Sequence, residues 1–188
     1  MTLTLIPLSP DLRPAYEALY ESSFPASERK DLDYMLTGDR SAAFEVLAVS
    51  TPDLPVAGMV ITVTHGDLTM LDYLAISPDL RGQGLGHAVL PMVRDRVKAQ
   101  NGGHFFLEIE TPPPLCIPRD PCDNAEQRVR RKAFYASAGM VETGVRAFIY
   151  GNDMELLAFP EDAAAVTFEG YDALLRATFP ADMTAEKI

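Results

Sequence analysis

The sequence predicts a mixed α/β (α+β) fold around a mostly antiparallel sheet of six to seven strands. Short apolar, β-branched runs are consistent with strands, and longer segments between them carry helical periodicity. Turn residues separate several consecutive strands, which favours antiparallel neighbours. With 188 residues, 47% of them apolar and 23% charged, the chain has the composition of one globular domain. We expect a single domain over residues 1–188.

The N-terminal half predicts one edge strand, two helices and three further strands. Residues 2–8 alternate well enough for the edge strand, and a helix follows through Tyr20. Phe24-Pro25 breaks this helix, and a second, short helix begins within Ser27–Lys30 and ends at Gly38. Apolar runs separated by turn residues predict consecutive strands over 43–49, 56–64 and 68–76.

The C-terminal half begins with a helix whose apolar residues recur at helical spacing until Asn101-Gly102-Gly103. Further elements follow in order: a strand over 105–109, a helix over 124–138 stopped by Gly139, a hairpin of 141–150 and 154–159 turning at Gly151-Asn152, and a helix over 168–179 ended by Pro180. We expect the core of the domain over about 3–159 and a helical extension over about 160–188.

Charge and composition exclude several classes of protein. A net charge of −11 disfavours a nucleic-acid partner, because phosphate binding needs an excess of Lys and Arg, and it suits a cationic partner. Neither a long apolar run nor the basic start of a secretory signal is present, so we expect a cytoplasmic protein without a membrane partner. Cys116 and Cys122 have the wrong spacing for a metal knuckle, so we expect reduced thiols and no metal.

Three alternating glycines, Gly82, Gly84 and Gly86, lie between a predicted strand and a predicted helix. Such a turn lets consecutive backbone N–H groups converge on an anion, and the helix dipole adds positive potential there. A dinucleotide fingerprint is excluded because His87 and Val89 stand where its third glycine is needed. A nucleoside-triphosphate loop is excluded because no Lys follows the glycines. A turn without a ligand remains the alternative.

The segment Arg81-Gly82-Gln83-Gly84-Leu85-Gly86 resembles the acetyl-CoA-binding motif of the GNAT family of N-acetyltransferases, Arg/Gln-x-x-Gly-x-Gly/Ala. Arg81, Gly84 and Gly86 fill its defining positions. Two further segments match the family in the same order: 105–110 looks like its fifth strand, and 134–140 is similar to its Phe-Tyr-x-x-x-Gly-Phe helix end. The resemblance runs from about Leu3 to Phe159.

The resemblance implies helices on both faces of the sheet and fourth and fifth strands that splay apart. It implies acetyl-CoA as co-substrate, bound by Leu74, Ala75, Ile76, Arg81, Gly82, Gln83, Gly84, Leu85, Gly86 and His87. The expected reaction transfers the acetyl group to a primary amine of a small molecule or peptide by direct attack on the thioester. A non-catalytic acyl-CoA-binding sensor of the same fold is the alternative, and a longer acyl chain also stays open.

The transfer needs a proton acceptor and a proton donor. An alkylammonium with a pKa of ~10.4 is neutral in only about one molecule in 2,500 at pH 7, so a carboxylate base would help. Glu110 is the first choice and Glu108 the second; both could instead orient a cationic substrate or face solvent. The resemblance places Tyr135 as the donor to the departing thiolate. Asp72 is a weaker candidate base.

The stretch Thr111–Cys122 is absent from the family pattern, so we expect it to decide the acceptor. Its prolines predict a long connection inside the domain. The helix over 168–179 either packs on the core or contributes to a homodimer.

Overall fold

The computed structural model describes residues 2–26, 28–149, 151–179 and 185–188. The chain divides into two compact units, the first formed by Met1–Val63 and Leu71–Ala99 and the second by Thr64–Met70 and Gln100–Ile188. The expectation of one domain over 1–188 therefore stays a prediction. Among the described residues, no helix is long and apolar enough to cross a membrane.

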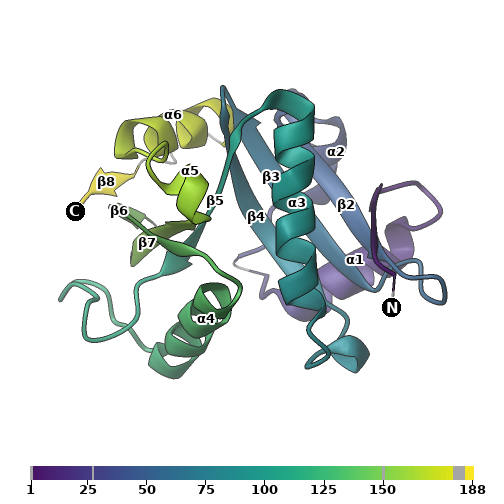
Figure 1. The fold of residues 1–188 in the computed structure, drawn as a ribbon, viewed down its shortest axis with the longest axis horizontal. Helices are drawn as coiled ribbons and strands as arrows, with labels where there is room; N and C mark the ends of the chain where they lie inside the picture. The colour runs from purple at the N-terminus through teal and green to yellow at the C-terminus, as the bar shows by residue number, and fades with distance from the viewer. Residues whose placement is uncertain (1, 27, 150, 180–184) are drawn as a thin grey trace. The chain divides into compact units, whose positions relative to one another are not determined.

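The described strands form a mixed, mostly antiparallel sheet in the order β1-β2-β3-β4-β5-β7-β6-β8 (Figure 1). This confirms the predicted fold class, with one strand more than the upper expected number. The start of β4, Leu68–Met70, belongs to the second unit and the rest of that strand to the first. The strands are β1 (Thr4–Pro7), β2 (Phe44–Ser50), β3 (Gly58–His65), β4 (Leu68–Ile76), β5 (His104–Glu110), β6 (Val141–Ile149), β7 (Asn152–Ala158) and β8 (Glu186–Lys187).

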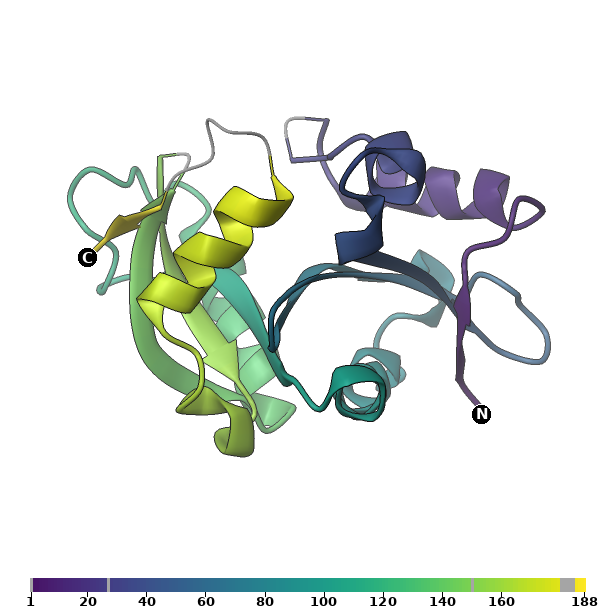
Figure 2. The ribbon, with the colours of Figure 1, turned by 90° about the horizontal axis from the view of Figure 1, so that it is seen from above.

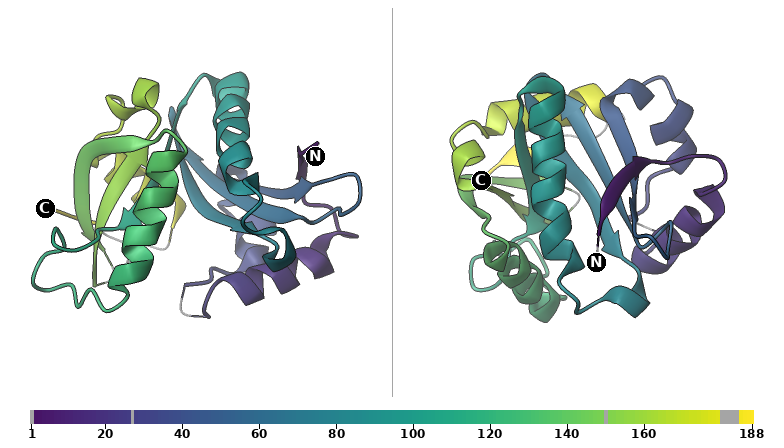
Figure 3. Two further views of the ribbon diagram at one scale, coloured as in Figure 1. Left: turned by 60° about the horizontal axis from the view of Figure 1, so that its bottom comes forward. Right: turned by 45° about the vertical axis from the view of Figure 1, so that its right-hand side comes forward.

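The first unit packs helices on both faces of its strands, as predicted. Figures 2 and 3 show α1 (Arg13–Ser23) and α2 (Leu32–Thr37) on one face and α3 (Leu85–Asn101) on the other. The core on the α1 side includes Tyr16, Met35 and Ile61, each at most 1% exposed. Burying such side chains supplies most of the stabilisation of a domain this small.

The second helix starts later than predicted. The predicted start within Ser27–Lys30 is wrong for the described residues, because α2 begins at Leu32 after an N-cap at Asp31; Ser27 itself lies outside those residues. The Lys30 N–H donates to the hydroxyl oxygens of Tyr20 (2.9 Å) and Tyr73 (3.1 Å). These long-range bonds replace the local helical ones, and no sequence pattern announces them.

The second unit contains the predicted hairpin of β6 and β7, in which Ile149 lies opposite Asn152. Tyr150 and Pro180, which belonged to the predicted hairpin and helix end, lie outside the described residues. Its helices are α4 (Ala125–Ser137), α5 (Pro160–Ala163) and α6 (Phe168–Thr178). The sequence did not predict α5 and β8, which are too short to show a period. The splaying of the fourth and fifth strands stays a prediction.

Candidate functional site

The glycine turn joins β4 to α3 through a short 3₁₀ helix, η2 (Pro78–Leu80). Gly82 and Gly84 have φ angles of 75° and 79°, in the left-handed region that only glycine adopts freely. A Cβ atom built on either glycine would meet no other atom within 4 Å. The glycines are therefore required by the backbone conformation, and the space beside them is open.

This turn presents the N-terminus of a long helix to that open space. The earliest bond of α3 outside its regular ladder runs from the Ala88 N–H to the Gly84 carbonyl oxygen (3.1 Å). The N–H groups of the first turn, such as those of Leu85 and Gly86, have no acceptor inside the helix and carry its positive dipole end. Arg81 is exposed, and its Nε donates to the Ile76 carbonyl oxygen (3.0 Å). The arrangement fits a phosphate-bearing ligand.

The predicted cofactor-binding residues thus form one stretch of the first unit. Ala75 is buried at 8% exposure, whereas Leu74 and Ile76 on the alternate face are half-buried. Arg81, Gly82, Gln83, Gly84 and His87 are exposed, Leu85 is buried and Gly86 is half-buried.

The two candidate bases on β5 have different partners. Glu108 accepts a hydrogen bond from the hydroxyl of Tyr171 on α6. Glu110 accepts two from the Asn124 amide (3.0 and 2.9 Å) and one from Arg131 (2.8 Å), and Arg128 lies 3.2 Å away. The lone pairs of Glu110 are therefore occupied by cations and an amide.

Tyr135 lies in the last turn of α4, and the motif around it ends that helix. Gly139 has a φ of 90°, and the Met140 N–H caps the Tyr135 carbonyl oxygen (3.1 Å). The Tyr135 hydroxyl has no hydrogen-bond partner in the part of the chain that the structure describes. Burial raises the pKa of Tyr135 to about 12, with Arg131 acting in the opposite sense. The phenol therefore keeps its proton at neutral pH and can donate it in a hydrogen bond.

Arg128 anchors the connection over 111–122, although sequence reasoning did not single it out. Its side chain is 1% exposed and binds both carboxylate oxygens of Asp120 (2.7 and 3.0 Å) and the Thr111 carbonyl oxygen (3.1 Å). Burial opposes ionisation of Asp120, but the bonds from Arg128 and the N–H groups of Asp153 and Cys122 outweigh it and lower its pKa. The ends of this connection are held by a buried, fully hydrogen-bonded ion pair.

Both cysteines lie in the same connection, each as a free thiol. The Cys116 thiol donates to the Cys122 sulfur at 2.7 Å. This contact and burial raise the pKa of Cys122 to about 11. Within the described residues, no three metal-ligating side chains gather in one place.

The weaker candidate base, Asp72, is paired. Its Oδ1 lies 2.5 Å from the Lys30 ammonium, which also lies 4.9 Å from the centre of the Tyr73 ring. The Asp72 side chain is 4% exposed, and its second oxygen is buried without a hydrogen-bond partner among the described residues. A buried carboxylate in this setting has little access to a substrate.

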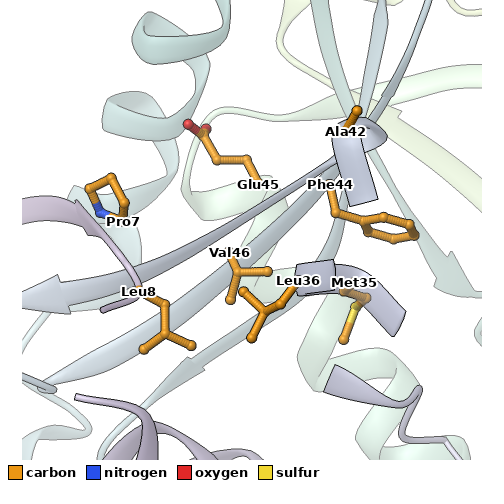
Figure 4. A pocket seen from close by; sticks show the side chains of 8 residues that line it. All are labelled: Pro7, Leu8, Met35, Leu36, Ala42, Phe44, Glu45 and Val46. Carbon is orange, nitrogen blue, oxygen red and sulfur yellow. The ribbon is translucent and has the colours of Figure 1, made fainter. Parts of the chain in front are cut away.

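A pocket of about 350 Å³ lies in the first unit, and none of the predicted site residues lines it (Figure 4). Its walls are mostly apolar, and its one charged side chain, Glu45, is held by Arg96 (2.6 Å). We assign this pocket no function. It is lined by Pro7, Leu8, Met35, Leu36, Ala42, Phe44, Glu45 and Val46.

The fold occurs in solved structures that include N-acetyltransferases. A Bacteroides thetaiotaomicron protein assigned to the GNAT acetyltransferases aligns over 92% of this chain and 96% of its own, with 23% identity and a TM-score of 0.70. Spermidine N-acetyltransferase from Vibrio cholerae, in complex with CoA and spermine, covers 86% and 97% at 16% identity and a TM-score of 0.60. At these identities the likeness shows the fold.

A third structure, the ribosomal-protein-S18-alanine N-acetyltransferase from Escherichia coli, covers 85% and 94% at 23% identity and a TM-score of 0.53. No protein of the curated set matches the sequence significantly.

The family itself is shown by the sequence. The model of the acetyltransferase (GNAT) family matches residues 9–113, which is more than half of the chain and includes the glycine turn and β5. The protein is therefore a member of the GNAT family, an N-acetyltransferase that takes its acetyl group from acetyl-CoA.

Proposed function

We propose that the protein transfers acetyl groups to a primary amine of a small molecule or a peptide. The observation that carries this proposal is the open glycine turn at the N-terminus of α3, in a chain of the GNAT family. The net charge of −11 favours a cationic acceptor, because long-range attraction raises the rate of encounter. The names of two structural neighbours supply candidate acceptors, which are polyamines and an alanine of a ribosomal protein.

The geometry of the glycine turn indicates which residues would bind acetyl-CoA. Backbone N–H groups over 83–86 would hold its diphosphate, with Arg81 adding charge, and the 74–76 backbone would receive its pantetheine arm. When bound, acetyl-CoA supplies the acetyl thioester. The open space beside Gly82 and Gly84 supports this assignment, because a side chain there would compete with the ligand. His87 belongs to the same first helical turn and stays a predicted contact.

For the base we propose Glu108, in place of Glu110, which was the first choice from the sequence. The oxygens of Glu110 are engaged by Asn124, Arg128 and Arg131, so this side chain holds α4 against β5. Glu108 is half-buried, and its contacts in the second unit include one neutral donor, the Tyr171 hydroxyl. Its role would be to take a proton from the acceptor ammonium.

For the donor we propose Tyr135. Its hydroxyl keeps its proton because its pKa is about 12, and it has no competing acceptor in the described part of the chain. A thiol has a pKa near ~8.5, so full transfer from Tyr135 would be uphill and the hydroxyl would act mainly as a hydrogen-bond donor. The predicted homodimer and the cytoplasmic location stay predictions.

The proposed function is tested by acetyl-CoA turnover, measured as free thiol, with spermidine, lysine and an alanyl peptide as acceptors. We expect turnover with at least one of these amines and, for Tyr135→Phe, a kcat about 100-fold lower at saturating acetyl-CoA. Tyr16→Phe is the control, since its hydroxyl bonds the Val60 carbonyl oxygen (3.3 Å) in the core. Full turnover by Tyr135→Phe would remove the donor assignment, and tight acetyl-CoA binding without turnover of any amine would contradict the function.

A further inference from the structure

The C-terminal helix α6 brings a buried hydroxyl group to Glu108. Tyr171 is 0% exposed, and its hydroxyl donates to the Glu108 carboxylate. The Tyr171 ring meets Phe106 edge-on, with ring centres 6.2 Å apart, and Phe106 and Glu108 lie on the same face of β5. The ring packing and the hydrogen bond therefore act on two consecutive positions of that face.

The helix that carries Tyr171 is fixed at its start. The Thr167 hydroxyl accepts the Gly170 N–H (3.1 Å), and the Tyr171 N–H bonds the Thr167 carbonyl oxygen (3.0 Å). Gly170 lies so close to Leu68 that a Cβ atom on it would be 2.6 Å from a Leu68 methyl group. Leu174 and Leu175 are buried further along α6. The Tyr171 hydroxyl is therefore held in one place.

We propose that Tyr171 is a positioning residue for the transfer: its hydroxyl holds the Glu108 carboxylate in the orientation in which it accepts the proton of the acceptor amine. The inference rests on the proposed role of Glu108. A carboxylate has four acceptor positions, and the bond from Tyr171 takes only one of them. A Glu side chain rotates about three bonds, and fixing it before the amine arrives removes an entropic cost from the reaction.

A purely structural role makes a different prediction. If the hydroxyl only satisfies its own hydrogen bond in the core, removing it costs stability and leaves the rate unchanged. Tyr171→Phe separates the two roles because it keeps the ring and its contact with Phe106. Tyr16→Phe is the matched control: Tyr16 is also 0% exposed, but its hydroxyl bonds a backbone carbonyl oxygen in the first unit.

The test compares Tyr171→Phe, Glu108→Gln and the double variant in the intact protein, with spermidine, lysine and the alanyl peptide as acceptors. We expect kcat to fall about 100-fold for Glu108→Gln and about tenfold for Tyr171→Phe, with KM for acetyl-CoA unchanged. The double variant should be no slower than Glu108→Gln, because the hydroxyl acts only through that carboxylate. Tyr16→Phe should keep the wild-type kcat.

The outcomes separate this inference from the function on which it rests. Full activity of Glu108→Gln would overturn the proposed base, whatever Tyr171→Phe does. A slow Glu108→Gln with a fully active Tyr171→Phe would overturn only the positioning role. A crystal structure of Tyr171→Phe gives a readout independent of turnover: the Glu108 carboxylate should leave its wild-type rotamer, and an unchanged rotamer contradicts the inference. Should Tyr171→Phe fail to fold, Glu108→Asp withdraws the carboxylate from the hydroxyl instead, and an unchanged kcat would count against us.

Discussion

The turn after β4 and the connection after β5 are held in place by different forces. The glycine turn is exposed, and its shape comes from two glycines with positive φ and a few hydrogen bonds, such as the one from Arg81 to the Ile76 carbonyl oxygen. The connection over 111–122 is held by buried charge, with Arg128 and Asp120 at its centre. The turn depends on what each residue's own backbone can adopt, whereas the connection depends on partners elsewhere in the chain.

The contrast fits the roles predicted for the two regions, the turn for the acetyl donor and the connection for the acceptor amine. A backbone cradle presents N–H groups that any phosphate can use, so it suits the part of the ligand that all family members share. An anchored loop presents particular side chains in a fixed arrangement, which suits selection among acceptors.

Arg128→Met should lower the free energy of unfolding by about 3–5 kcal/mol, because it leaves the Asp120 carboxylate buried without its partner. Urea denaturation measures the change. Arg130→Met is the control, since Arg130 is 70% exposed and should change stability by less than about 0.5 kcal/mol. Adding Asp120→Asn to Arg128→Met should recover part of the loss. Equal losses for Arg128 and Arg130 would remove the contrast between the two regions.

Gly84→Ala should cost about 1–2 kcal/mol, because an L-residue is strained at a φ of 79°. It should also weaken acetyl-CoA binding at least tenfold, since the methyl group enters the space assigned to the ligand. Calorimetry measures both changes. Gly66→Ala is matched, with a φ of 61° and equally open surroundings at the β3–β4 turn. Gly66→Ala should lose stability but bind acetyl-CoA with the wild-type affinity. An equal loss of affinity in both variants would argue against the proposed diphosphate site over 83–86.

Acid should weaken the ion pair of Asp120 and Arg128 before it affects the glycine turn. The pKa of Asp120 is lowered in the folded protein, so its contribution is complete above the ordinary value of 3.8 and is lost as the pH falls below it. The stability difference between wild type and the Asp120→Asn, Arg128→Met double variant should therefore shrink below about pH 3.8. Urea denaturation at pH 6 and at pH 3 would show this, and a constant difference would contradict it.

Arg81→Ala should have the smallest effect on folding, less than about 0.5 kcal/mol, because Arg81 is exposed. Its affinity for acetyl-CoA should fall severalfold if the guanidinium supplements the backbone cradle. Increasing salt should narrow that gap between the variant and the wild type. An affinity equal to wild type at low salt would restrict the role of Arg81 to its bond with Ile76.

Much of the fold could be predicted from the sequence because its signals are local. A mostly apolar run after the turn at Gly66 predicted the position of β4 to the residue, and glycines marked the start of α3 and the ends of α2 and α4. The Tyr135 helix end could be predicted for the same reason, since a glycine with positive φ stops a helix wherever it occurs. In each case the signal comes from the conformational preference of the residue itself.

The rest of the candidate site could be predicted from the sequence only in part. Glu108 and Glu110 are two apart on one strand, and their spacing alone cannot tell which is held by arginine and which by tyrosine. Their partners come from α4, from the segment just before it and from α6. An ion pair such as that of Arg128 with Asp120 produces no periodic pattern in the sequence. Arg128, Arg130 and Arg131 lie close together on α4, and the sequence does not show that Arg128 is the one that is buried.

The hydrogen bond from Tyr171 to Glu108 joins residues 63 positions apart, and this separation has a consequence for the order of events in synthesis. Contacts between distant segments form late, because the intervening chain must be ordered first. The glycine turn and β5 leave the ribosome well before α6 does. A growing chain therefore completes the segment proposed to bind acetyl-CoA before its proposed base is fixed, and on this view full activity begins only when the last helix has docked.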